Sequence, residues 1–302
     1  MRAGLFLVFA GVIMAAAVSA SSVTAAPGDS TAYHLYPTPA LRASRPGTVP
    51  RPDVTTPTML YYGGPVLSKV KVVLVIWGSQ VNATTVAGIG AFYTGIVKST
   101  FVDQLSQYAT GLTGVNGHAG THQAIGRGTY AGQFKIGPAN KSTALTDAAV
   151  QKELKAQIAA KHLPVADLNT LYMVYFPAGT SISIGTDASC RTFSAYHSAS
   201  VTKAAAANNM FYGVFPDCGA GFAHLTVASS HEFAEAVSDA IPTPGSHPAY
   251  PQAWNTKDGF EIADLCEKLS PTTLAVGIKT YSVTRAFLNS TKACSKGPFK
   301  SP

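Results

Sequence analysis

Residues 69–77 read Lys-Val-Lys-Val-Val-Leu-Val-Ile-Trp, and this run decides the fold class. Its β-branched residues, followed at once by Gly78, predict a strand that is buried at the centre of a sheet. Two shorter apolar segments, 171–176 and 211–215, predict two further strands. The chain is therefore expected to build its core around a sheet.

Helical patterns alternate with these strands along the chain. Residues 84–108 predict a long helical region, 142–162 predict an amphipathic helix with a Ser or Thr cap, and 222–240 predict a third helix. Glycines that punctuate 126–136 predict a hairpin. The order of strand, helix, hairpin, helix, two strands and helix predicts an α/β domain with a mixed sheet, and it leaves α+β as the alternative.

The first residues have the pattern of an export signal. Residues 1–25 combine Arg2 with an uncharged apolar stretch and small residues, which predicts a secretory signal peptide, with a signal anchor as the alternative. Residues 26–58 are rich in Pro, Ala, Arg and Thr and predict a disordered leader or pro-segment. One folded domain, 59–302, is expected to follow. These features predict a secreted protein, extracellular or in the cell wall or periplasm, without a membrane span.

The charge of the chain is mildly positive and dispersed. Lys and Arg number 22 against 15 Asp and Glu, and loss of Arg2 with the signal peptide lowers the net charge from +7 to about +6. No run of basic residues interleaved with aromatic ones is present, which argues against nucleic-acid binding. The charge is instead consistent with solubility and with attraction to anionic cell-wall polymers.

Four cysteines, an even number in a chain expected to be exported, predict two disulfide bonds. Three pairings are possible, and the sequence does not choose among them. The pairing that we prefer joins sequence neighbours and closes two local loops of equal span. A cysteine-ligated zinc site is the alternative, although no C-x-x-C pair is present. The preferred pairs are Cys190 with Cys218 and Cys266 with Cys294.

Residues 230–239 read Ser-His-Glu-Phe-Ala-Glu-Ala-Val-Ser-Asp and carry the strongest chemical signal. On a helix, His231 and Glu235 lie about 40° apart around the axis with about 6 Å of rise, so both can face one metal ion. Glu232, beside them, is placed to act as general base toward a water molecule that the metal activates. The pattern lacks the second histidine of H-E-x-x-H, and solvated carboxylates on an amphipathic helix are the alternative.

A third metal ligand has to come from another segment. Residues 258–266 read Asp-Gly-Phe-Glu-Ile-Ala-Asp-Leu-Cys, in which Glu261 is our first choice and Asp264 our second. The alternative is that these acids merely solvate a loop. His224 and Asp239 lie about 10 Å and about 12 Å along a regular helix from the histidine ligand, so neither is expected to share its metal ion.

His197 is a second candidate catalytic residue. It lies in a Tyr-His-Ser segment near Cys190, from which it could supply a hydrogen bond in the transition state. The alternative is an ordinary histidine at the surface or at the edge of the core.

Several separate segments resemble the phosphate-induced protein 1 (EXORDIUM-like) family and its secreted microbial relatives. The resemblance covers about Met59 to Cys266 in scattered blocks, and it is more specific as a set than in any one block. The matching segments are 61–68 (Tyr-Tyr-Gly-Gly-Pro-Val-Leu-Ser), 76–78 (Ile-Trp-Gly), Cys190 with 196–198 (Tyr-His-Ser), 212–218 (Tyr-Gly-Val-Phe-Pro-Asp-Cys), 230–239, Trp254 and 261–266 (Glu-Ile-Ala-Asp-Leu-Cys).

The resemblance implies an extracellular or cell-wall protein and does not by itself settle an activity. The helix separately looks like the active-site helix of zincin metallopeptidases, from which His231 carries over as a metal ligand and Glu232 as general base. Glu235 departs from the second histidine of that pattern. Zinc is the metal that the resemblance to this helix predicts. Two carboxylates with one imidazole are less specific for zinc than two histidines, and they leave manganese or calcium as alternatives.

Together these features predict a secreted, zinc-dependent hydrolase that cleaves a peptide or protein substrate. The alternative is a non-catalytic extracellular or cell-wall interaction protein that keeps a metallopeptidase-like scaffold. Such a protein would use its acidic cleft for calcium, a glycan or a peptide. The leader is expected to mask the cleft until it is removed.

Overall fold

The structure is a computed structural model that describes residues 1, 35–37, 57–200, 209–242 and 248–302. Nearly all of the expected signal peptide, 1–25, and most of the expected leader, 26–58, lie outside these residues. Within the described part of the chain, no helix is both long and apolar enough to cross a membrane.

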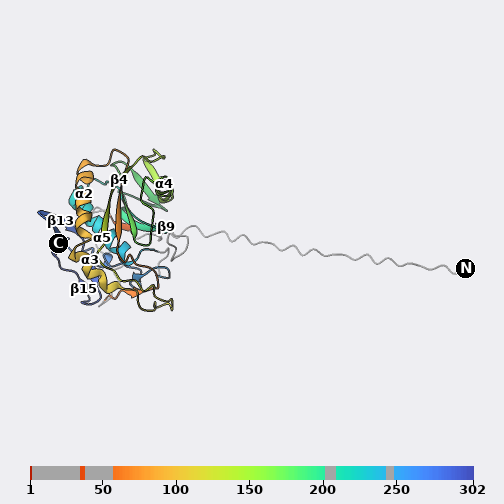
Figure 1. Ribbon diagram of the computed structural model, residues 1–302, viewed down its shortest axis with the longest axis vertical. Coiled ribbons are helices and arrows are strands. Elements are labelled where there is room, and N and C mark those ends of the chain that lie inside the picture. Colours follow the sequence, from red (N-terminus) through yellow and green to blue (C-terminus); the bar gives the residue numbers. More distant parts are fainter. Residues whose placement is uncertain (2–34, 38–56, 201–208, 243–247) are drawn as a thin grey trace.

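A six-stranded mixed sheet forms the centre of the molecule (Figure 1). In order across the sheet, its strands are β1 (Leu35–Pro37), β9 (Phe193–Ser200), β10 (Met210–Phe215), β6 (Thr170–Tyr175), β3 (Lys71–Trp77) and β4 (Thr129–Ile136). Strands β10, β6, β3 and β4 are mutually parallel, whereas β9 is antiparallel to β10 and β1 is antiparallel to β9. The expected α/β class with a mixed sheet is confirmed.

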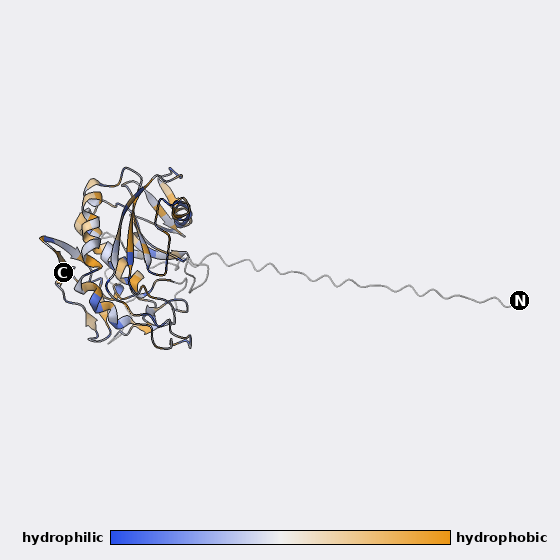
Figure 2. Ribbon diagram, viewed as in Figure 1, coloured by the Kyte–Doolittle hydropathy of each residue, from blue (hydrophilic) through white to orange (hydrophobic). Residues whose placement is uncertain are grey.

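Helices cover both faces of this sheet (Figure 1). On one face lie α2 (Ala83–Ile96), α3 (Thr100–Asp103), the 3₁₀ helix η1 (Gln104–Tyr108) and α5 (Gly221–Ser238), and on the other lies α4 (Asp147–Ala159). The hydrophobic colour of Figure 2 is strong on α2, on α5 and in the strands between the helices. The central strand β3 is accordingly buried on both sides, with Val72 to Ile76 at most 1% exposed.

Small sheets surround this core. They contain β2 (Leu60–Tyr61) with β11 (Trp254–Asn255); β5 (Ala144–Thr146), β7 (Ser181–Ile184) and β8 (Asp187–Ala188); β12 (Thr272–Val276), β13 (Lys279–Val283) and β16 (Phe299–Lys300); and β14 (Phe287–Leu288) with β15 (Ala293–Cys294). A second 3₁₀ helix, η2 (Asp264–Cys266), follows β11.

The expected strands at 69–77, 171–176 and 211–215 are confirmed as β3, β6 and β10. The expected helix at 84–108 is instead interrupted after α2, because the Ser99 hydroxyl accepts a hydrogen bond from the Phe101 amide and starts a new helix, α3. The expected helix at 142–162 begins later, at Asp147, where Thr146 is the cap.

The hairpin predicted for 126–136 is wrong. Those residues contain one strand, β4, which pairs in parallel with β3 along its whole length. Gly132 has a φ of 116° and marks an irregularity in that pairing, so the glycine signal reported a bulge and not a turn. Strand β9 was not predicted, because its Ser, Ala and His residues give little β signal.

Both preferred disulfide bonds are present. Cys190 pairs with Cys218 and Cys266 pairs with Cys294, and each bond joins residues 28 positions apart. The first bond joins the segment before β9 to the segment after β10. The second joins η2 to β15, next to the acidic segment that the sequence analysis singled out.

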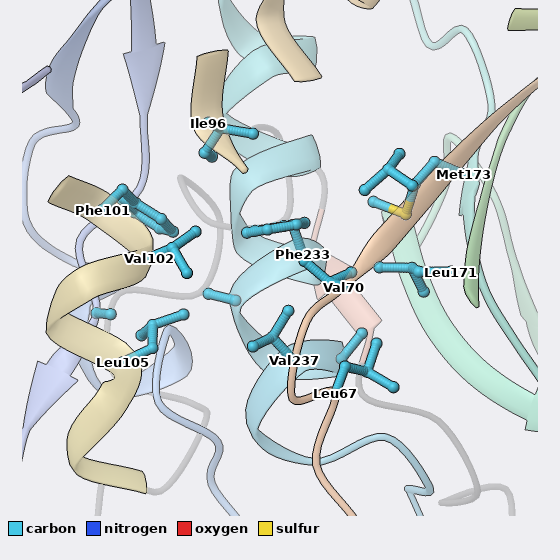
Figure 3. Packing of buried hydrophobic residues seen from close by; sticks show 14 of the residues in the cluster. Leu67, Val70, Ile96, Phe101, Val102, Leu105, Leu171, Met173, Phe233 and Val237 are labelled. Carbon is cyan, nitrogen blue, oxygen red and sulfur yellow. The ribbon is translucent and has the colours of Figure 1, made fainter. Parts of the chain in front are cut away.

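Helix α5 is anchored by its apolar side. Phe233 and Val237 are 0% exposed and pack between α3 and strand β6 (Figure 3). Phe233 lies on the side of the helix opposite His231, since two residues correspond to about 200° of rotation, and Val237, about 240° around the axis from His231, adjoins it on that side. The same packing that buries the apolar side therefore fixes the direction in which the polar side faces.

Replacing this anchor should destabilise the protein strongly. We expect Phe233→Ala to lower the free energy of unfolding by about 3–5 kcal/mol, because a buried aromatic ring is lost and a cavity remains. Ile278→Ala, at a fully exposed position, should change it by less than about 0.5 kcal/mol. Urea unfolding followed by circular dichroism measures both, and equal effects of the two substitutions would contradict this account of how α5 is held.

Candidate metal centre

Helix α5 presents three polar residues to the sheet. His231, Glu232 and Glu235 are at most 1% exposed, and all three lie within one turn or so of each other. The turn before them is fixed from outside the helix, since the Ser230 hydroxyl accepts a hydrogen bond from the Thr284 amide at 2.8 Å. The expected helix at 222–240 is thus present as Gly221–Ser238 and is buried from Thr226 to its end, so the alternative of solvated carboxylates does not describe it.

Strand β9 contributes the second imidazole of the site. His197 is 0% exposed, and its Nδ1 lies 3.1 Å from Glu232 Oε2 and 3.9 Å from Glu235 Oε2. This is neither a surface histidine nor an ordinary core histidine, because two carboxylates face one of its nitrogens. The strand, which the sequence did not predict, is what brings His197 to the helix.

Three side chains converge on one point beside this pair. His231 Nε2 lies 3.1 Å from Glu235 Oε1 and 3.5 Å from Asp264 Oδ1. One ligand atom from each of the three residues lies within 4.8 Å of the other two. The Asp264 amide also donates to Glu235 Oε1 at 3.2 Å, so the start of η2 is tied directly to the helix.

The two candidates for the third ligand take different places. Asp264, the second choice from the sequence, contacts His231, whereas Glu261, the first choice, has its Oε1 3.6 Å from His197 Nε2. The Glu261 amide donates to Asp264 Oδ2 at 3.0 Å, so a hydrogen bond holds the two acidic residues in a fixed position relative to each other. The geometry therefore ranks Asp264 before Glu261 as a partner of His231 and Glu235.

His224 and Asp239, which lie too far along the helix to share a metal ion with His231, also have defined contacts. Asp239 follows the end of α5, accepts a hydrogen bond from the Ala253 amide at 2.8 Å and accepts a second from the Asn255 side chain. It holds the segment that leads to Glu261 and Asp264, as a cap on the following structure. The ring of His224 lies 5.7 Å from that of Tyr36, on strand β1.

Tyr36 is a part of the site that sequence reasoning missed. It is 2% exposed, and its ring centroid lies 4.6 Å from that of His231 in an edge arrangement. The only local signal is the concentration of aromatic residues in Tyr-His-Leu-Tyr at 33–36, which is too short to predict a strand by itself. The expectation of a disordered leader does not hold for residues 35–37, which form strand β1.

Burial shifts the pKa values of the acidic side chains upward. Burial raises the pKa of Glu235 to about 7, although the charge of His231 acts in the opposite direction. Burial, and then the charge of Glu235, raise the pKa of Glu261 well above its usual range. For His231, burial lowers the pKa, but Glu235 and Asp264 outweigh it and hold the pKa well above the usual value. The cluster formed by His231, Glu235 and Glu261 therefore retains protons near neutral pH.

The donor set fits a divalent metal ion. Glu235 Oε2 is buried and has no hydrogen-bond partner among the described residues. The imidazoles of His197 and His231 lie at ion-pair distance from the four acids. Imidazole nitrogen with carboxylate oxygen suits zinc or manganese, whereas calcium takes oxygen ligands. Two groups of three residues could hold such an ion, and they share Glu235: His231, Glu235 and Asp264, and His197, Glu232 and Glu235. We assign the ion to the first group, which leaves Glu232 for the role of base.

Comparison of the chain with known protein families, with curated proteins and with solved structures found no match.

Removal of a ligand should remove the metal. We expect His231→Ala and Asp264→Asn each to weaken zinc binding by more than the roughly 10–100-fold that changes beside a metal site cost. Glu261→Gln is the matched control and should stay within that range, because Glu261 contacts His197 and not His231. Zinc retained on a desalted sample, measured by plasma mass spectrometry, tests this. Loss of zinc in Glu261→Gln but not in Asp264→Asn would reverse the order of the two acids.

Zinc affinity should also depend on pH. Protons held by Glu235, whose pKa is about 7, and by His231 must leave when zinc binds, so affinity should fall as the pH decreases through neutrality. The expected slope is up to about tenfold in Kd per pH unit for each displaced proton. Isothermal titration calorimetry in buffers of different ionisation enthalpy counts those protons. A Kd independent of pH in this range would show that the site is already deprotonated.

Proposed function

We propose that this protein is a secreted, metal-dependent hydrolase of peptide bonds. One observation carries the proposal: the ligand atoms of His231, Glu235 and Asp264 converge within 4.8 Å, and the carboxylate of Glu232 lies beside them on the same helix. A metal-holding cluster next to a general base is what hydrolysis by activated water requires. The proposed metal is zinc, with manganese as the alternative and calcium less suited because of the imidazole.

A divalent ion in this cluster would supply a Lewis acid that activates water and polarises a scissile carbonyl. Glu232 then acts as general base. It accepts a proton from the attacking water as the oxygen adds to the carbonyl carbon, and it returns that proton to the amine nitrogen as the C–N bond breaks. The result is one carboxylic acid and one amine from one amide and one water.

His197 is assigned a positioning role toward Glu232. Its Nδ1 lies 3.1 Å from Glu232 Oε2. The imidazole therefore holds one carboxylate oxygen in place, and this orients the other oxygen of the same carboxylate. The 3.6 Å approach of Glu261 to Nε2 holds the ring from its far side. An imidazole between two carboxylates also stabilises the negative charge of the base in a dry site.

Two further observations support export. The disulfide bonds favour an oxidising compartment, such as the extracellular space, the cell wall or the periplasm. The resemblance to the phosphate-induced protein 1 family favours the same locations. The proposed partners are a peptide or protein substrate and, through the dispersed positive charge, anionic cell-wall polymers.

The burial of the site favours a second candidate function. His231, Glu232 and Glu235 are essentially inaccessible, and neither of the two cavities described for this molecule is lined by them. A buried ion would be suitable for a structural role in a non-catalytic interaction protein. The two candidates differ in whether Glu232 is needed for turnover.

Replacement of the general base separates the two functions. We expect Glu232→Gln to lower turnover of peptide substrates by about 10²–10⁴-fold while zinc content stays unchanged, because general base catalysis contributes a factor of this size. Digestion of a peptide library, read by mass spectrometry, measures turnover for wild type and variant.

Glu153→Gln is the matched control. Glu153 is also a buried glutamate, but it lies on α4, on the opposite face of the sheet, where it accepts a hydrogen bond from Gln157. Its substitution should leave the turnover number unchanged. Equal turnover of wild type and Glu232→Gln would favour the non-catalytic candidate.

A further inference from the structure

Strand β1 covers one edge of the central sheet. It pairs in antiparallel register with β9, with Leu35 opposite Tyr196 and Tyr36 opposite Ala195. Without these three residues, β9 would be the edge strand, and its backbone groups would be open to pairing with another extended segment. Pro37 has no amide hydrogen, which limits how far this pairing can continue.

The side chain of Tyr36 lies over the metal centre. Cross-strand partners point to the same face of a sheet, so Tyr36 shares a face with Ala195 and, two residues further along β9, with His197. Its ring contacts the ring of His231 at 4.6 Å between centroids. A buried aromatic ring in this position shields His231 from solvent.

A cavity lies near Tyr36, on the far side of His224. It has a volume of about 230 Å³, and its lining includes His224, whose ring also contacts Tyr36, and Ser194 of β9. Tyr175 and Phe215, at the ends of the parallel strands β6 and β10, line it as well. His224 thus lies between this cavity and Tyr36, whereas Tyr36 and His231 themselves do not line the cavity.

We propose that the β9 edge is a binding site for an extended polypeptide with an aromatic side chain in the place of Tyr36. The chain's own residues 35–37 are its first occupant and hold the metal centre closed. An added strand is recognised through its backbone, and the pocket for one side chain gives selectivity. The opening of the metal centre rests on the proposed function, whereas the binding of a peptide does not.

The test uses the full chain with a recognition sequence for a specific protease placed within 38–56. After folding, this site is cut in the presence of EDTA, so that no metal can protect His231. Reactivity of His231 toward diethyl pyrocarbonate, mapped by mass spectrometry, reports its exposure, and exposed His122 is the internal reference. Binding of a fluorescent peptide with the sequence of residues 33–39 is measured by anisotropy.

Tyr36→Ala and Tyr36→Phe are the matched variants, because only the first removes the ring. In the cut protein, we expect Tyr36→Ala to raise the reactivity of His231 at least about tenfold relative to Tyr36→Phe and wild type, since burial of the ring holds the strand in place. The labelled peptide should bind the Tyr36→Ala protein, and a peptide with alanine in place of the Tyr36 equivalent should bind at least about tenfold more weakly.

His231 that stays equally unreactive in all three proteins, with no peptide bound, would overturn the proposal. Peptide binding without zinc or turnover would uphold the binding site and reject the hydrolase. Zinc binding and turnover without binding of the peptide would uphold the hydrolase and reject the peptide-binding site.

Discussion

The constraint on which this structure depends is the burial of a cluster of acids. Four carboxylates, those of Glu232, Glu235, Glu261 and Asp264, lie together with two imidazoles between a helix and a sheet, and three of the four are 0% exposed. Ionised groups taken out of water cost several kcal/mol each unless they are paired. The two imidazoles provide part of this pairing, and bound protons or a cation can provide more. The elements around the cluster keep the acids and the imidazoles together.

Those surroundings act from three directions. Helix α5 is held by Phe233 and Val237 on its apolar side, so its polar side cannot rotate away from β9. The segment carrying Glu261 and Asp264 is held by Asp239 at one end and by the disulfide of Cys266 at the other. Each part of the site thus comes from an element that is fixed by packing or covalent bonding elsewhere, which is how a binding geometry is kept.

The sequence predicted the parts whose signal is local. Helix α5, strand β3 and the four acids could be predicted from short patterns, because periodicity and motif spacing are properties of neighbouring residues. The even number of cysteines predicted two disulfides, but their pairing was a preference that only the structure decided. The proximity of His197 and the choice of Asp264 over Glu261 depend on how distant elements pack, which no short pattern specifies. Strand β1 was missed for the same reason, since three residues form a strand only because β9 is there to pair with them.

The pairing of β1 with β9 has a consequence for the behaviour of many molecules together. The three residues of β1 are joined to the rest of the domain only through residues 38–56, so the same three residues from a neighbouring copy present an identical strand to the β9 edge. Attachment in one chain raises the effective concentration of the internal strand into about the millimolar range, which favours self-coverage in dilute solution. At higher protein concentrations, or after the connection is cut, strand exchange between copies becomes the competing arrangement, and the edge would then join two molecules.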